Sequence, residues 1–324
     1  MKLTIRELAS QFPTIDERPL QAMTSENSDT TAEERAKQLI QLLNVEQIGD
    51  ATFLGMRQPG GMGRVFGGQV IAQGLVSAMR TVEEETRVVH SLHAYFMRGG
   101  SEDLPITYSV DRDFDGGSFS TRRVTALQED RPILTMTASF HRIEQGFAHQ
   151  DAMPNVPGPE TLMTEAERIE QETDPQTAAI LTHFQRVRPI EVRWVEPRSF
   201  ANPVASEPKS HAWFRFRGDA GEDQNLHRAI LSYMSDMALL GTAALPHAIN
   251  WHTAGFQSAS LDHAVWLHDD VRVDEWLLYA TDSPWAGRAR GFNRGSFYAQ
   301  DGRLVASVAQ EGLMRYRPPA TAGA

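Results

Sequence analysis

The sequence predicts an α+β fold in which one module is used twice in tandem. Long strand-like runs follow one another without intervening helices, which favours antiparallel meanders over alternating strands and helices. A long apolar helix is expected before each group of runs. Residues 128–140 (QEDRPILTMTASF) also match residues 299–312 (AQDGRLVASVAQEG) when Gln128 is set on Gln300. Repetition on this scale indicates a duplicated module.

The first half is expected to begin with a helix, because Thr31 and Glu34 have the spacing of a capping box before AEERAKQLIQLL (32–43). A strand at 52–56, a glycine-rich turn and an apolar helix at 70–79 follow. Gly67 and Gly68 stand at the N-terminus of that helix, where free N–H groups suit an anion or a developing oxyanion. Close packing explains these glycines equally well. The strands of this half are expected at 90–97, 105–115, 118–128 and 132–142.

A second group of elements follows a polar, partly helical segment. Its strands are expected at 190–197, 211–218, 260–268, 275–283, 288–300 and 303–315, with a helix at 226–241. We therefore expect a poorly ordered N-terminal extension (1–35), a first repeat (36–145), a linker with helical segments (146–187), a second repeat (188–317) and a tail (318–324).

The helix expected at 226–241 carries a carboxylate at the edge of its apolar face. At about 100° per residue, Asp236 lies beside Ala229 and Leu240. A buried charge without partners is costly, so Asp236 either has partners or reaches water.

Two further polar residues distinguish the second repeat from the first. Gln310 stands where the first repeat has Ala138, and Ser260 opens the strand expected at 260–268. Together with Asp236, these side chains have the chemistry to activate a water: a carboxylate accepts its proton, while an amide and a hydroxyl hold it. The alternative is that Gln310 and Ser260 only satisfy backbone groups of a sheet.

The composition limits the classes of function. The net charge of −11 argues against general nucleic-acid binding, and the absence of cysteine excludes a thiolate nucleophile and cysteine-based metal sites. No apolar run approaches a membrane span. The start lacks a signal-peptide core and the last residues do not match a peroxisomal address, so we expect a cytoplasmic protein.

Long motifs in both halves resemble the acyl-CoA thioesterase II family. They include RVFGGQVIAQGL (64–75), YMSDMALLGTAALPH (233–247), SASLDHAVWLHDD (258–270) and RARGFNRGSFYAQDGRLVASVAQEGLMR (288–315), and the resemblance runs from about residue 36 to 317. It implies a double hotdog fold, with two long helices each wrapped by an antiparallel sheet. It also implies hydrolysis of fatty acyl-CoA to free acid and CoA without metal or cofactor. The family's catalytic trio falls on Asp236, Ser260 and Gln310, with Ser260 where some members carry Thr.

Other residues are candidates for substrate contact. His263 lies beside Asp262, and strand alternation places it on the face opposite Ser260. Arginines are the best candidates for the CoA phosphates. These are Arg288, Arg290 and Arg294, with Arg122 and Arg123 in the first repeat.

Two alternative functions remain open at this stage. One is a hotdog hydratase acting on enoyl-CoA, for which Asp262 and His263 would form the necessary pair. The other is a non-catalytic acyl-CoA binder. Sheet edges in such folds tend to be paired between subunits, so a homo-oligomer, dimer or tetramer, is expected.

Overall fold

The computed structural model describes residues 30–57, 63–83 and 86–317. Most of the expected N-terminal extension, part of the glycine-rich turn and the tail lie outside these residues. The first helix, α2 (Ala32–Leu43), begins with the expected capping box between Thr31 and Glu34.

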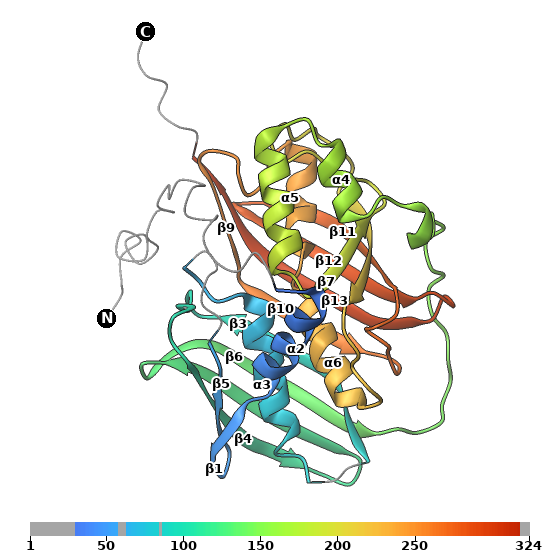
Figure 1. The fold of residues 1–324 in the computed structure, drawn as a ribbon. Coiled ribbons are helices and arrows are strands. Elements are labelled where there is room, and N and C mark those ends of the chain that lie inside the picture. The colour runs from blue at the N-terminus through green and yellow to red at the C-terminus, as the bar shows by residue number, and fades with distance from the viewer. Residues whose placement is uncertain (1–29, 58–62, 84–85, 318–324) are drawn as a thin grey trace. The chain divides into compact units, whose positions relative to one another are not determined.

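The strands of the described residues form one antiparallel sheet (Figure 1). In the first half they are β1 (Glu46–Gly49), β2 (Thr52–Gly55), β3 (Arg87–Phe96), β4 (Ile106–Asp115), β5 (Phe119–Gln128) and β6 (Arg131–Arg142). In the second half they are β7 (Ile190–Trp194), β8 (Lys209–Phe216), β9 (Phe256–Ser260), β10 (Asp262–Leu267), β11 (Leu277–Gly287), β12 (Arg290–Ala299) and β13 (Leu304–Tyr316). The short strand β1 was not expected.

The order of the strands shows the duplication. The first half runs β2-β4-β5-β6-β3 and the second β8-β11-β12-β13-β10, so these five strands of one half have counterparts in the other, whereas β9 lies off this path and pairs with β13. The halves join where β3 and β10 pair, with Leu92 opposite Val265. This arrangement is the double hotdog expected from the sequence.

One long helix packs on the sheet in each half. Helix α3 (Gly67–Met79) carries no charged residue and is buried along most of its length, and α6 (Gln224–Ser235) lies against it. Figure 1 shows the two helices side by side in front of the sheet. The end of the second repeat's helix therefore meets the helix of the first repeat.

The helix expected at 226–241 is shorter in the structure. Helix α6 ends at Ser235, with Asp236 as its C-cap, and Ala238 has a left-handed backbone with φ of 65°. A 3-10 helix, η3 (Leu239–His247), then continues the chain. By length and composition Gln224–His247 could cross a membrane, but 67% of its apolar window is buried in the fold, as in a core helix.

The strand expected at 260–268 is two strands. Ser260 ends β9 and lies opposite Gly312, whereas Ala264 in β10 lies opposite Ala309. From Ser260 to Ala264 the chain advances by four residues, while the partner strand β13 advances by three, from Gly312 to Ala309. One extra residue between β9 and β10 thus shifts the alternation of side chains. His263 consequently lies on the same face of the sheet as Ser260, and the expectation of opposite faces was wrong.

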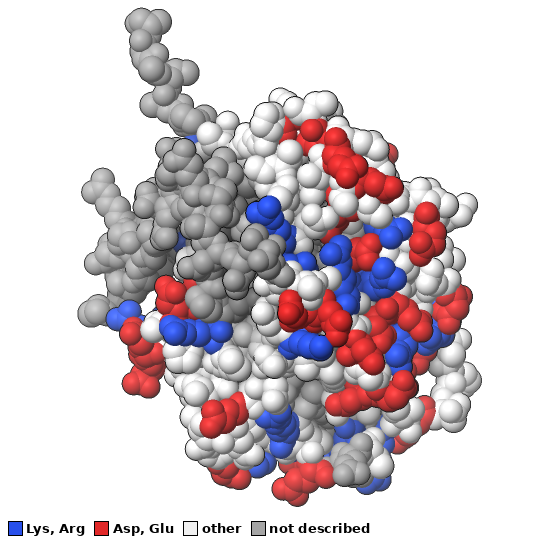
Figure 2. Space-filling model, viewed as in Figure 1, with Lys and Arg blue, Asp and Glu red and all other residues white. Residues whose placement is uncertain are grey.

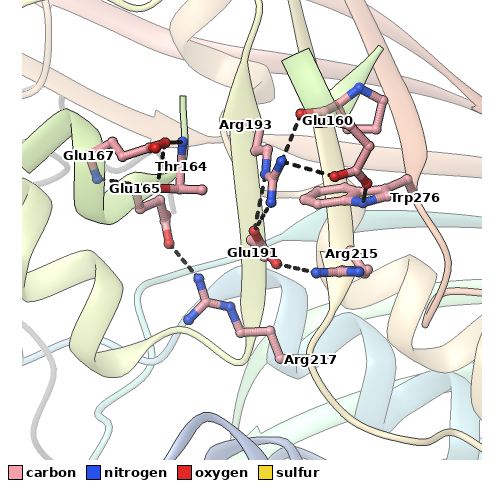
Figure 3. A network of polar contacts seen from close by, with 10 residues as sticks. Glu160, Thr164, Glu165, Glu167, Glu191, Arg193, Arg215, Arg217 and Trp276 are labelled. Carbon is pink, nitrogen blue, oxygen red and sulfur yellow. Dashed lines mark hydrogen bonds and ion pairs between the residues drawn. The ribbon is translucent and has the colours of Figure 1, made fainter. Parts of the chain in front are cut away.

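The segment between the repeats carries η2 (Pro159–Thr161), α4 (Glu165–Gln171) and α5 (Pro175–Val187). Ion pairs hold it against β7 and β8 (Figure 3). Arg217 of the loop after β8 pairs with Glu165 of α4 at 3.0 Å, and Arg193 of β7 pairs with Glu160 of η2 at 3.6 Å. Trp276 donates its indole N–H to Glu160. These contacts fasten the segment to the second repeat.

Candidate active site

The three residues singled out from the sequence meet at one point inside the fold. Gln310 donates from Nε2 to Asp236 Oδ1 at 2.7 Å and to Ser260 Oγ at 3.0 Å. Gln310 is fully buried, and the side chain of Asp236 is 6% exposed. One amide therefore fixes both a carboxylate and a hydroxyl.

Each of these side chains comes from a different element. Asp236 caps α6, Gln310 lies in the middle of β13, and Ser260 ends β9. Gln310 and Gly312 are two residues apart on β13, so they share the core face. Ser260, opposite Gly312, projects from the same face beside Gln310.

The carboxyl of Asp236 is unusually basic. Burial raises the pKa of Asp236 to about 6, while hydrogen bonds from Gln310 and from the backbone N–H of Gly68 act in the opposite direction. A carboxyl group with such a pKa is mostly ionised at pH 7, yet it holds a proton more readily than an ordinary aspartate and can both accept and return one.

The first repeat contributes to this site through the N-terminus of α3. A Cβ on Gly67 would lie 2.7 Å from Asp236 Oδ2, and a Cβ on Gly68 would lie 2.5 Å from the carbonyl oxygen of Tyr233. Only glycine allows this approach of α3 to the end of α6. The close-packing explanation of the two glycines thus holds, and the N–H of Gly68 serves the carboxylate.

A buried polar residue that the sequence did not single out, Asn293, supports the trio. Asn293 is fully buried on β12 opposite Gln310, and its Oδ1 accepts from the N–H of Ala243 at 2.9 Å. It thereby holds η3 over the sheet next to Gln310. The available signal was a polar residue at an inward position of GFNRGSF (291–297), between glycines.

His263 is also part of this interior. It is 1% exposed, its Nε2 lies 2.8 Å from Ser235 Oγ, and its Nδ1 lies 3.9 Å from Asp236 Oδ1. Asp262, its neighbour, accepts the backbone N–H of Glu311 at 2.6 Å. The two side chains have separate partners and do not form the acid–base couple that a hydratase would need.

The structure does not bring the candidate arginines to the trio. Arg290 lies on the outer face of β12, where it pairs with Glu311 at 3.3 Å, and Arg288 is exposed in the turn before it. Arg294 and Arg123 are exposed and pair with Asp282 and Asp113. On the face seen in Figure 2, basic and acidic side chains are intermixed. The assignment of Arg288 and Arg290 to the CoA phosphates stays a prediction.

Arg122 is excluded from that role. It is 2% exposed, and its guanidinium donates to Thr81 Oγ1 at 2.9 Å and to Asp115 at 2.8 Å. The expectation that Arg122 contacts phosphate was wrong, because inward-facing strand positions bury even an arginine when partners surround it.

Comparisons with known proteins agree with this architecture. Residues 57–141 match the model of the acyl-CoA thioesterase N-terminal domain, and residues 182–313 match that of acyl-CoA thioesterase. Acyl-coenzyme A thioesterase 8 of Homo sapiens is 38% identical over 90% of this chain and 93% of its own length. Acyl-CoA thioesterase 2 of Haemophilus influenzae is 36% identical over 86% of this chain and 97% of its own.

Solved structures show the same relationship. The crystal structure of an acyl-CoA thioesterase II from Mycobacterium marinum is 40% identical, with a TM-score of 0.71 over 85% of this chain and 97% of that chain. A hotdog-fold protein from Alicyclobacillus acidocaldarius, 18% identical with a TM-score of 0.67 over 86% of this chain and 97% of that chain, shares the fold. The chain therefore belongs to the acyl-CoA thioesterase II family and is an acyl-CoA thioester hydrolase.

Proposed function

We propose that the protein hydrolyses fatty acyl-CoA thioesters by activating a water at Asp236. The observation that carries this proposal is the pair of hydrogen bonds from Gln310 Nε2 to Asp236 and to Ser260. Because both amide protons of Gln310 are used in these bonds, its Oε1 is left to accept. That atom is buried and has no hydrogen-bond partner among the described residues.

The attacking water would donate one proton to Asp236 and the other to Gln310 Oε1. Asp236 removes its proton as the oxygen attacks the thioester carbon, which is the role of a general base. The hydroxyl of Ser260 accepts from Gln310, so its own proton is available for the water or for the substrate carbonyl. Positioning by two fixed partners lowers the entropic part of the barrier.

The products follow from the proton balance. The water oxygen bonds to the acyl carbon, the C–S bond breaks, and the proton held by Asp236 passes to the CoA sulfur. The free acid and CoA thiol leave without a metal or a covalent intermediate on the protein. A thiolate is a good leaving group, so no stronger nucleophile is required.

The test is a panel of acyl-CoA thioesters of different chain length, with free thiol as the readout. The wild-type protein should release thiol, and Asp236→Ala should release it at least ~100-fold more slowly. An enoyl-CoA in the same panel separates hydration of the double bond from thiol release. Binding without release of thiol in every case would indicate a non-catalytic binder and overturn the proposal.

The cellular location and assembly are further proposals. The cytoplasmic location rests on the sequence alone. A homo-oligomer is supported by the edge strands β1 and β7, which end the sheet on either side and offer unpaired backbone groups. Light scattering of the purified protein, with a monomer as the contradicting result, tests the second point.

A further inference from the structure

His263 is a buried titratable residue that the proposed reaction does not yet use. It projects from β10 into the interior beside Asp236 and is 1% exposed. Its Nδ1 atom has no hydrogen-bond partner among the described residues, and it lies 3.9 Å from Asp236 Oδ1, too far for a hydrogen bond. A buried nitrogen left in this state next to the catalytic carboxyl calls for an explanation.

The other ring nitrogen fixes the tautomer of His263. Its Nε2 lies 2.8 Å from Ser235 Oγ, and Ser235 donates its single hydroxyl proton to the carbonyl oxygen of Ser232 at 2.9 Å. This carbonyl belongs to the last turn of α6, where carbonyls lack an intrahelical donor. When Ser235 gives its proton to this carbonyl, its Oγ accepts from the ring, and the proton of a neutral imidazole is then on Nε2.

The ring is neutral in the folded protein. Burial lowers the pKa of His263 to about 3, so the ring carries one proton at physiological pH. The contact with Asp236 is thus not an ion pair, although its distance would allow one. A neutral ring with its proton on Nε2 presents the lone pair of Nδ1 to the carboxylate.

The remaining groups around Asp236 are neutral donors or phenols. Gln310 and the N–H of Gly68 donate to the carboxylate, from β13 and α3. Tyr233 of α6 and Tyr279 of β11 interact with its charge, and burial raises the pKa of both phenols, to about 12 for Tyr233. Arg188 acts on Tyr233 from the end of α5. Of these described groups, His263 presents a nitrogen lone pair to Asp236.

We propose that His263 is a positioning residue whose Nδ1 lone pair makes Asp236 a better base and receives the O–H of Asp236 after proton transfer. The lone pair disfavours the carboxylate anion. Once Asp236 holds the proton of the attacking water, a shift of about 1 Å closes the gap to hydrogen-bond length. The proton stays on the carboxyl oxygen and passes to the CoA sulfur when the C–S bond breaks. This inference rests on the proposed role of Asp236.

The first experiment changes the tautomer and leaves the ring in place. In Ser235→Ala the ring loses its acceptor at Nε2, and its proton can move to Nδ1 and donate to Asp236. In the pH profile of kcat/KM, the rise on the acid side should then move to lower pH by at least ~0.5 unit, because a hydrogen-bond donor stabilises the Asp236 carboxylate. This part of the profile is called the acid limb. Ser232→Ala is the matched control: its hydroxyl is equally buried and donates to the carbonyl of Arg228, so the limb should stay in place.

The second experiment replaces the ring. In His263→Asn the side-chain amide can donate to Asp236, and the limb should again move to lower pH, with kcat reduced about tenfold. If the acid limb of the kcat/KM profile stays at the wild-type pH in Ser235→Ala and His263→Asn, the proposal is overturned.

A third test uses the wild-type protein and does not depend on whether a variant folds. Nitrogen-15 chemical shifts of the histidine rings at pH 7 should show His263 neutral, with the proton on Nε2. A proton on Nδ1, or a charged ring, would overturn the proposal. The chemical shifts do not depend on catalysis, so they test the role of His263 alone. The role of Asp236 is tested separately by thiol release from Asp236→Ala.

Discussion

Gln310 Nε2 lies 2.7 Å from Asp236 Oδ1 and so ties the middle of β13 to the end of α6. The amide compensates part of the cost of burying a carboxylate, and the same amide aligns Ser260. Structural support and chemistry thus depend on one contact. The consequences can be measured separately through pH dependence, stability and turnover.

Removing the amide should make Asp236 more basic. Hydrogen bonding from Gln310 lowers the pKa of the carboxyl, so Gln310→Leu should raise it above about 6. The acid limb of kcat/KM should move to higher pH, opposite to the shift expected for Ser235→Ala. Turnover at pH 8 should also fall by at least ~10-fold, since the water loses a partner. An acid limb that moves to lower pH would contradict the assignment of this hydrogen bond.

Ser260 should be replaceable by threonine but not by alanine. Ser260→Thr keeps the hydroxyl that accepts from Gln310, and kcat/KM should stay within ~3-fold of wild type. Ser260→Ala removes it and should reduce kcat/KM by at least ~10-fold, with thiol release as the measurement. Equal activity of the alanine and threonine variants would show that the hydroxyl has no part in the reaction.

Gly68→Ala should disturb the junction of the two helices. The added Cβ would lie 2.5 Å from the carbonyl oxygen of Tyr233, so α3 must move away from α6 and from Asp236. Overpacking of this kind costs about 1–3 kcal/mol, measured by denaturant unfolding. Gly117→Ala is the control, because a Cβ there meets nothing within 4 Å. Equal stability of the two variants would argue against the close approach.

The buried carboxylate should make stability depend on pH. The folded-state pKa of Asp236, about 6, is above the ordinary value of 3.8. The folded protein therefore binds the extra proton between these values, and stability falls as pH rises through this window, by about 3 kcal/mol in total.

In Asp236→Asn, stability should not fall in this way as pH rises. The unfolding free energy of the variant relative to wild type should increase by about 2–3 kcal/mol from pH 4 to pH 8. Any cost from the lost acceptor for Gly68 is independent of pH and does not enter this difference. A constant difference between the two proteins over this range would show that Asp236 is not the titrating group.

The sequence predicted most elements because both halves follow simple patterns. Strands β3 to β6 and β11 to β13 alternate regularly between glycine, aspartate and proline breaks, and the boundaries agree within a few residues. Gln310 and Asp236 were found because each is a polar residue in an apolar stretch. The first repeat has Ala138 at the position of Gln310 and no charged residue in the helix expected at 70–79.

The errors in the end of α6 and in the face of His263 share a cause, which is local backbone geometry without a sequence signal. Ala238 adopts a left-handed conformation that ordinarily selects glycine or asparagine, so nothing marks the end of α6. The extra residue between β9 and β10 likewise is not marked by a glycine in the sequence. It places His263 on the face of the sheet opposite to the one that strand alternation predicts. Both irregularities lie next to the site, where functional demands outweigh local preference.

The central claim, that Asp236 activates the attacking water, is tested most directly by Asp236→Asn. The variant keeps the shape of the side chain and can still accept from Gln310, so the fold should be retained, as judged by circular dichroism. At pH 8 its kcat/KM for an acyl-CoA should fall by at least ~100-fold, equivalent to about 2.7 kcal/mol. A folded Asp236→Asn protein with kcat/KM within ~3-fold of wild type would contradict the claim.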